Sequence, residues 1–122
     1  MPVAGPVGLG AAAAAKVDGN TLIIGVDSDW VQSASEYKDI VLTSVMKDIS
    51  NAVYDTVKEA SAGNWTSDNY VGTLANAGVG LAPFYDFESQ LPDGLTDELD
   101  QLKKDIIDGK IVVESESAFE VK

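Results

Sequence analysis

Hydrophobic residues along the chain form short runs that predict alternating strands and helices. The clearest run covers residues 22–26, where four of the five residues are apolar and two are isoleucines, as is typical of a strand buried on both faces. The run ends at two carboxylates, Asp27 and Asp29, and Trp30 comes directly after them. Because ligands of open α/β sheets bind at the carboxyl ends of strands, this strand end is the first candidate site.

Three helices are predicted from spacing and composition. Residues 11–16 are strong helix formers that come after a glycine-rich loop. Asp39 is a suitable N-cap for a long helix through about residue 60, and Thr96 is one for a last helix that ends before Gly109. The long helix has an apolar stripe at three- and four-residue spacing, which consists of Leu42, Val45, Met46, Ile49, Val53, Val57 and Ala60.

Further strands are predicted at residues 70–74 and 110–113, with a loop over residues 85–94. The loop, helix and strand of residues 5–26 form the second half of a βαβ unit. The expected fold is therefore α/β, with a mostly parallel sheet flanked by helices.

The composition limits the functions open to the chain. Its 122 residues, 45% of them hydrophobic, correspond to one globular domain or less. The net charge of −12 gives no basic footprint for nucleic acid. The absence of histidine and cysteine excludes a Ser-His-Asp triad, a thiolate metal site and disulfides from this chain. No apolar run is long enough to span a membrane, and the first residues lack the features of a signal peptide.

The carboxylates at the strand end have three interpretations. In the simplest, Asp27 and Asp29 only turn the chain and cap the segment after the strand. As metal ligands they are too few, since Ca²⁺ takes roughly six to eight oxygens, and no metal or other cofactor is expected. As acceptors they can bind the vicinal hydroxyl groups of a ribose or another polyol, and Trp30 can line the same cleft. Lys47, beside the apolar stripe of the long helix, is either a solvated residue or a donor to the ligand.

The glycine-rich loop suggests an alternative function. Gly5, Gly8 and Gly10 precede a helix, where backbone N–H groups can bind a phosphate. With Asp27 downstream, the loop imitates a dinucleotide-binding unit, so a nucleotide-dependent enzyme is the rival interpretation. However, the spacing is GxxGxG rather than GxGxxG, and Pro6 removes one donor. Close packing of the loop and helix against a sheet is the simpler explanation of the glycines.

The order of these segments resembles that of a known family. AGPVGLG at residues 4–10, IGVDSD at 24–29 and VLTSVMK at 41–47 are similar to segments of the basic membrane protein (BMP) family. GVGLAPF at residues 78–84 and DIIDGKI at 105–111 are similar to its closing segments. The family consists of solute-binding lipoproteins of ABC importers and includes bacterial purine nucleoside receptors. The resemblance therefore covers most of the chain.

The resemblance implies a type I periplasmic-binding-protein fold, in which two α/β lobes enclose the ligand and no reaction is catalysed. Residues 1–122 would be a partial C-terminal segment of it, with the N-terminal portion absent. The full-length protein would be lipid-anchored at the outer side of the cell envelope, where it would pass a purine nucleoside or related riboside to an ABC permease. The segment alone would be a half-cleft, or a non-binding remnant that forms a homodimer to cover its exposed sheet edge.

The resemblance also assigns roles to single residues. It implies that Asp27 accepts the ribose hydroxyl groups, that Lys47 donates to the ligand, and that Gly5 lets the backbone approach it closely. Asp29 would have a supporting role. A glutamine often comes after the second aspartate in the family, whereas this chain has Trp30, and this difference bears on the identity of the ligand rather than on its class.

Because the chain would hold only half of a cleft, we expect it to bind adenosine, guanosine or inosine weakly or not at all. Isothermal titration calorimetry measures this affinity, and a submicromolar dissociation constant would contradict the expectation.

A thermal-shift panel separates the nucleoside receptor from the nucleotide-dependent enzyme. Nucleosides would raise the melting temperature of the receptor, and dinucleotides would raise that of the enzyme.

Overall fold

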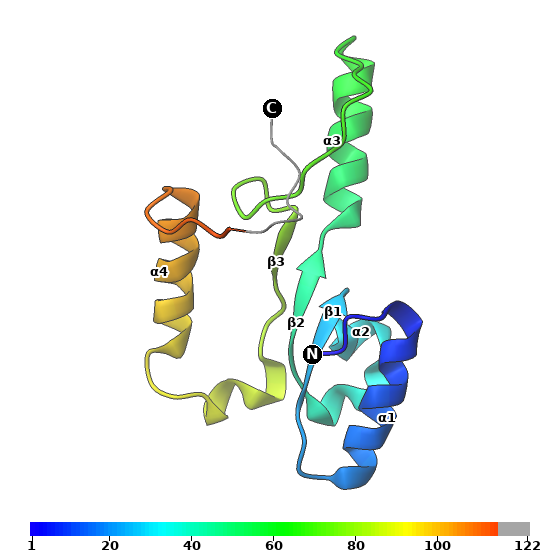
Figure 1. The fold of residues 1–122 in the computed structure, drawn as a ribbon, viewed down its shortest axis with the longest axis vertical. Coiled ribbons are helices and arrows are strands. Elements are labelled where there is room, and N and C mark those ends of the chain that lie inside the picture. Colours follow the sequence, from blue (N-terminus) through cyan, green and yellow to red (C-terminus); the bar gives the residue numbers. More distant parts are fainter. Residues whose placement is uncertain (115–122) are drawn as a thin grey trace. The chain divides into compact units, whose positions relative to one another are not determined.

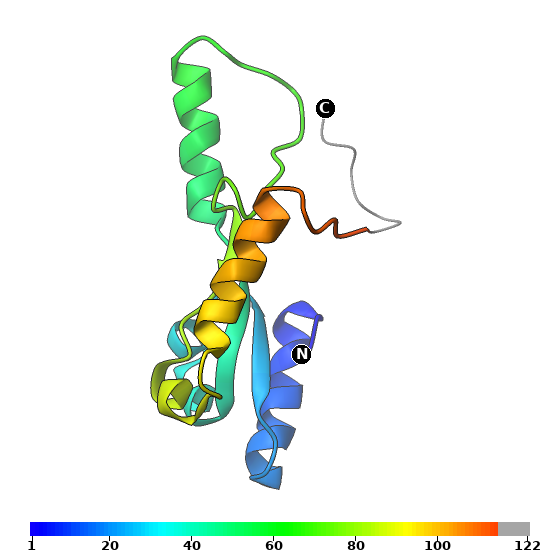
Figure 2. The same cartoon turned by 90° about the vertical axis from the view of Figure 1, so that its left-hand side faces the viewer.

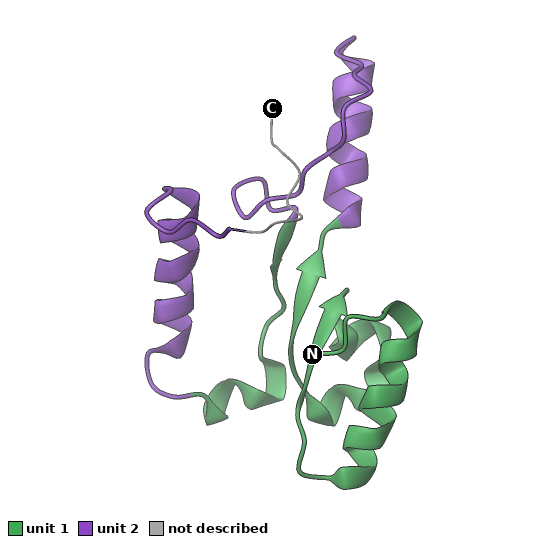
Figure 3. Cartoon of the chain, viewed as in Figure 1, with its two compact units in different colours: residues 1–48, 79–91 green, residues 49–78, 92–122 purple. Residues whose placement is uncertain are grey.

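The computed structural model describes residues 1–114, which form two compact units (Figure 3). Unit 1 comprises residues 1–48 and 79–91, and unit 2 comprises residues 49–78 and the described part of residues 92–122. Figure 1 shows the elements of both units. Unit 1 contains η1 (Gly5–Val7), α1 (Gly8–Asp18), β1 (Ile23–Asp27), α2 (Trp30–Ser33), η2 (Ser35–Ile40), β2 (Val41–Lys47), β3 (Val79–Leu81) and η3 (Tyr85–Gln90). Unit 2 contains α3 (Ile49–Ser61) and α4 (Leu95–Ile107).

The sheet of unit 1 has the strand order β1-β2-β3. β1 and β2 are parallel, with Asp27 opposite Met46, and β3 runs antiparallel to β2, with Val79 opposite Lys47. Because β1 and β2 run in the same direction, Asp27 and Lys47 end their strands at the same edge of the sheet. The predicted α/β class, with a mostly parallel sheet flanked by helices, is confirmed.

The core of unit 1 is built around one large side chain, that of Trp30, which is 6% exposed. The other buried residues of this core are smaller: Ala12, Ala15, Ile23, Ala34 and Val41. Alanines on the inner face of α1 let this helix lie close beside β1, as both views show (Figures 1 and 2). The predicted alanine-rich helix is therefore confirmed, although it begins earlier, at Gly8.

Trp30 is held between β1 and α1 by two close approaches to glycine, of which the one at Gly25 leaves no room for a Cβ atom. A Cβ atom on Gly25 of β1 would lie 2.4 Å from Ser44 Oγ and 2.7 Å from Trp30 Cγ. At the other end of the ring, a Cβ atom on Gly8 of α1 would lie 3.1 Å from Trp30 Cη2. Ser44 is fully buried, and its hydroxyl group accepts a hydrogen bond from the Trp30 backbone N–H at 3.1 Å. The tryptophan thus links α1, β1 and β2.

The predicted helix over residues 39–60 is wrong in its first half, because β2 occupies residues 41–47 and α3 begins only at Ile49. A strand with apolar residues on both faces matches a helical stripe over a short run, so spacing alone could not separate the two. The buried polar residues of β2 are bonded through long-range contacts: Thr43 donates from its hydroxyl group to the Ala82 carbonyl oxygen at 2.7 Å.

The predicted strand at residues 70–74 is also wrong, since this segment has no regular secondary structure. The Asn76 side chain accepts hydrogen bonds from the backbone N–H groups of Thr73 at 2.7 Å and Gly78 at 3.0 Å. These bonds turn the chain before β3 begins at Val79. A local side-chain turn therefore outweighs the β propensity of the segment.

The last helix is confirmed, but its ends differ in detail. Gly94 rather than Thr96 stands at its N-cap, and no side chain caps it. Gly109 has a positive φ of 73°, as predicted for the residue that ends a helix. The predicted strand at residues 110–113 is absent, because the first N–H groups there donate to the Asp105 carbonyl oxygen and wrap the chain around the helix end.

Short helices also lie outside the predicted ones, since α2 and η2 come after β1 and η3 lies within the loop predicted over residues 85–94. The apolar stripe predicted for residues 39–60 is exposed where it lies on α3, with Val53 at 58% and Val57 at 61%. Across the described residues, every helix is too short or too polar to cross a bilayer.

Replacement of Gly25 by alanine tests the contact that holds Trp30. The added methyl group would overlap Ser44 and Trp30, so we expect Gly25→Ala to lower the free energy of unfolding by about 1–3 kcal/mol. Gly10→Ala, in α1, is the matched control, because a Cβ atom at this position would meet nothing within 4 Å. This substitution should stabilise the chain by roughly 0.5–1 kcal/mol, since alanine favours the helix more than glycine does. Urea unfolding followed by circular dichroism measures both changes, and equal effects of the two substitutions would refute this packing.

Candidate functional site

A hollow of about 290 Å³ lies at the carboxyl end of β1 in unit 1. Its walls come from η1, α1, β1 and α2 and consist of Pro2, Gly5, Pro6, Leu9, Val26, Asp27, Ser28, Trp30, Ser33 and Ala34. Three predicted site residues, Gly5, Asp27 and Trp30, therefore line one hollow, although Gly5 is far from the other two in the sequence.

Asp27 has an unusual backbone conformation for a residue with a side chain. Its φ is 72°, in the left-handed region that disfavours most residues and that costs roughly 1–2 kcal/mol. Aspartate tolerates this region better than most residues. Strained backbone of this kind is typical of ligand sites, where the surrounding structure holds it in place.

Lys47 lies beside Asp27, as its Nζ atom is 2.8 Å from Asp27 Oδ1. The two side chains are 67% and 47% exposed, so solvent screens this ion pair and its contribution to stability is small. The Oδ1 atom itself is buried beside the lysine, and this ion pair is its contact. Because the side chain is 47% exposed while Oδ1 is buried, the other oxygen, Oδ2, is the one that can accept from another donor.

Asp29 points elsewhere, and its carboxylate is fully engaged in local structure. It caps α2 by accepting the Val31 backbone N–H at 3.0 Å. Its other oxygen accepts hydrogen bonds from Gln32 Nε2 at 2.8 Å and from the Tyr85 hydroxyl group. The capping interpretation thus describes Asp29, which does not line the hollow.

The bond to Asp29 raises the pKa of Tyr85 above its ordinary value of 10.0, because the neutral phenol donates to the carboxylate. The Gln32 amide, 3.2 Å from the Tyr85 hydroxyl oxygen, opposes this rise. The contact ties η3 to α2, two elements that are distant in the sequence. It contributes to stability below about pH 10 and loses that contribution as the pH rises through the pKa of Tyr85.

The glycine-rich segment does not form an open phosphate loop. Gly5–Val7 is a turn of 3₁₀ helix, and the Gly8 backbone N–H donates to the carbonyl oxygens of Gly5 and Pro6. Among the described residues the first strand comes after this segment rather than preceding it. The arrangement of a dinucleotide-binding unit is therefore not observed in residues 1–114.

Sequence reasoning missed several residues around the strand end. Ser28 and Ser33 both line the hollow, with their hydroxyl oxygens 2.9 Å apart. Ser28 stands between Asp27 and Asp29 in the sequence, so its position alone could have identified it as a residue near the candidate site. Tyr85 was not accessible to sequence reasoning, because only the folded sheet brings it to Asp29.

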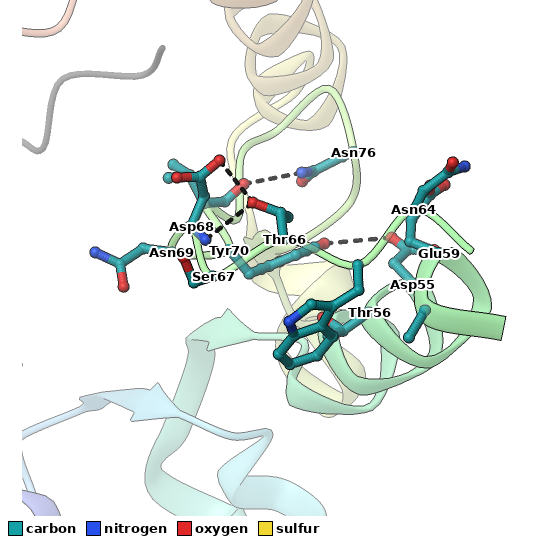
Figure 4. A pocket seen from close by; sticks show the side chains of 13 residues that line it. Asp55, Thr56, Glu59, Asn64, Thr66, Ser67, Asp68, Asn69, Tyr70 and Asn76 are labelled. Atoms are coloured by element: carbon teal, nitrogen blue, oxygen red, sulfur yellow. Dashed lines mark hydrogen bonds between the residues drawn. The ribbon is translucent and has the colours of Figure 1, made fainter. Parts of the chain in front are cut away.

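A second, larger hollow of about 600 Å³ lies within unit 2 (Figure 4). Its polar side chains are bonded to one another. The Tyr70 hydroxyl group donates to Asp55 Oδ2 at 3.4 Å, and the Thr66 hydroxyl group donates to Asp68 Oδ2 at 2.8 Å. Trp65 in its wall is 72% exposed. Size alone favours this hollow, but the hollow in unit 1 has the strained aspartate with free acceptor capacity and is the better candidate.

In the described part of the chain, acidic residues do not gather in groups of three or more that could hold a metal.

The bond between Tyr85 and Asp29 can be tested by changing only the charge. Asp29→Asn keeps a good N-cap for α2 but removes the carboxylate, so the pKa of Tyr85 should fall back toward 10.0. NMR titration of the Tyr85 ring carbon measures this change, and the exposed Tyr54 ring serves as an internal reference. An unchanged Tyr85 titration would show that the bond is absent in solution.

Comparison with known proteins agrees with this architecture. The family model of the ABC transporter substrate-binding protein PnrA-like (Bmp) family matches residues 1–117. A search of curated proteins finds no significant match. Among solved structures, an ABC transporter system solute-binding protein from Conexibacter woesei DSM 14684 is similar, with 19% identity and a TM-score of 0.57. The match covers 88% of this chain and 33% of that one, so the chain spans about a third of that protein's length. At this identity the likeness shows the fold alone. Since the family model covers almost all residues, the chain belongs to the Bmp family of PnrA-like ABC transporter substrate-binding proteins.

Proposed function

We propose that unit 1 supplies one wall of a riboside-binding site, with a purine nucleoside as the best candidate ligand. The observation that carries this proposal is Asp27, a residue with strained backbone at a strand end, whose lysine partner contacts Oδ1 and leaves the other carboxylate oxygen available as an acceptor. A carboxylate is an acceptor only, so it matches a ligand that presents hydroxyl donors. Two vicinal hydroxyl groups of a ribose satisfy one carboxylate at once.

Lys47 gives the site its second polar function. The ammonium group beside Asp27 offsets the carboxylate charge and donates to a ligand acceptor, such as a ring oxygen or a base nitrogen. Because the ion pair is solvent-exposed, its rearrangement around a ligand costs little. Donor and acceptor thus stand side by side, as recognition of a neutral polar ligand requires.

The hollow also has an apolar surface suited to a sugar face or a base. Pro6, Leu9 and Trp30 line it together with Gly5, whose lack of a side chain leaves the backbone open to the ligand. Its volume of about 290 Å³ is at the lower end of ligand pockets, which typically have roughly 300–1,000 Å³. A second wall from elsewhere in a full-length protein would complete the enclosure.

For the whole protein, we propose the role of an extracytoplasmic, lipid-anchored receptor that delivers the nucleoside to an ABC permease. The family match and the solute-binding relative support this role, and binding rather than catalysis is the expected activity. The rival proposal of a nucleotide-dependent enzyme has less support, because the Gly8 backbone N–H is used within η1 and the segment forms a 3₁₀ turn rather than an open loop.

NMR titration of the labelled chain with millimolar inosine tests ribose recognition by the half-site. We expect weak binding, with amide shift changes centred on Gly5, Asp27 and Lys47. Asp27→Asn should weaken the binding about tenfold or more, since hydrogen bonds to a charged group are worth roughly 1.5–3 kcal/mol. Asp29→Asn is the matched control, because Asp29 does not line the hollow, and it should leave the binding unchanged.

A ligand variant sharpens the test. 2′,3′-Dideoxyinosine, which lacks the vicinal hydroxyl groups, should lose affinity to the same extent as the Asp27→Asn chain, and the two losses should not add. Equal binding of inosine and its dideoxy form would refute the proposed role of Asp27. Shift changes centred on unit 2 would place the ligand in the other hollow and refute the proposed site.

A further inference from the structure

The backbone conformation of Asp27 has an identifiable cause in the side chain three residues later. The indole Nε1–H of Trp30 donates a hydrogen bond to the Val26 carbonyl oxygen at 3.0 Å. This carbonyl group belongs to the peptide unit that joins Val26 to Asp27. Because a peptide unit is planar, an interaction that orients the carbonyl oxygen also orients the N–H of Asp27.

The φ angle of Asp27 is the rotation about the bond directly after this peptide unit. The indole restrains the plane before this bond, and the chain turns from β1 toward α2 through Asp27 with φ at 72°. A residue with a side chain stays in this region only where its surroundings hold it there. The hydrogen bond from Trp30 is such a restraint.

The indole is itself held rigidly, so it can act as a fixed reference for the strand end. The backbone N–H of Trp30 donates to the buried hydroxyl group of Ser44 at 3.1 Å, and the indole ring fits between Gly25 and Gly8. The ring is 6% exposed, so the packed core around it restrains its position. The position of the Val26 carbonyl oxygen thus depends on the packed core of unit 1.

We propose that Trp30 is a positioning residue for the ligand site: through the Val26 peptide unit it holds the Asp27 carboxylate in the orientation that receives the ligand hydroxyl groups. This inference rests on the proposed function of Asp27. It gives Trp30 a role beyond that of an apolar wall of the hollow, because a wall residue needs its ring but not its N–H group.

Removal of the N–H alone separates positioning from packing. Trp30 is replaced by 3-benzothienylalanine, in which sulfur takes the place of the indole N–H and the ring size is almost the same. Trp30→Phe is a second variant that also lacks the donor but leaves part of the volume empty. Trp65→Phe is the matched control, since Trp65 lies in unit 2 and is largely exposed.

Two readouts are taken on the labelled 122-residue chain. The Cα and Cβ chemical shifts of Asp27, measured without ligand, report its backbone conformation. The dissociation constant of inosine, measured by NMR titration, reports the site. We expect the sulfur analogue to keep the rest of the spectrum, to move the Asp27 shifts away from left-handed values, and to weaken inosine binding about fivefold to tenfold. Trp65→Phe should change neither readout.

The outcomes distinguish this inference from the proposed function. Asp27 shifts that stay left-handed in the sulfur analogue overturn the positioning role, even if inosine binds as proposed. Asp27 shifts that move in the analogue, in a chain whose native form does not respond to inosine, support the positioning of Asp27 and contradict the proposed function. If Trp30→Phe does not fold, the sulfur analogue alone decides the question.

Discussion

The close approach of Trp30 to Gly25 and Ser44 is the constraint on which unit 1 depends. The other buried side chains of this core are alanines, one valine and one isoleucine, so a single tryptophan provides most of its volume. Removal of such a side chain typically costs roughly 3–5 kcal/mol. The same residue also links the sheet to its helices, because α1 accommodates the ring at Gly8 and β2 bonds its backbone through Ser44.

This packing has a direct consequence for chemistry at the edge of the sheet. The parallel pairing of β1 and β2 brings Asp27 and Lys47 to one edge, and the indole of Trp30 bonds to the Val26 carbonyl oxygen just before Asp27. In our proposal, this charged pair and the hollow next to Asp27 supply the two properties of a small-molecule site: orientation by a few polar groups and contact area from apolar ones. Asp29 stabilises the local fold, because it caps α2 and accepts a hydrogen bond from Tyr85.

The sequence predicted the features that depend on local composition. The apolar run of β1, the alanine-rich helix and the left-handed Gly109 were all identifiable, and the order of segments indicated the family. β2 was not, because a strand buried on both faces has the same short-range spacing as a helix. Of the residues proposed for the site from sequence, Asp27 and Gly5 line one hollow, whereas the bond between Asp29 and Tyr85 depends on contacts that only the fold creates.

In our central proposal, Asp27 at the end of β1 is the acceptor for ligand hydroxyl groups. A crystal structure of the chain soaked with a purine nucleoside at high concentration tests it most directly. We predict the ribose in the hollow of unit 1, with its vicinal hydroxyl groups within hydrogen-bonding distance of the Asp27 carboxylate and Lys47 turned toward the ligand. A nucleoside bound elsewhere, or bound in this hollow with its hydroxyl groups away from Asp27, would contradict the proposal.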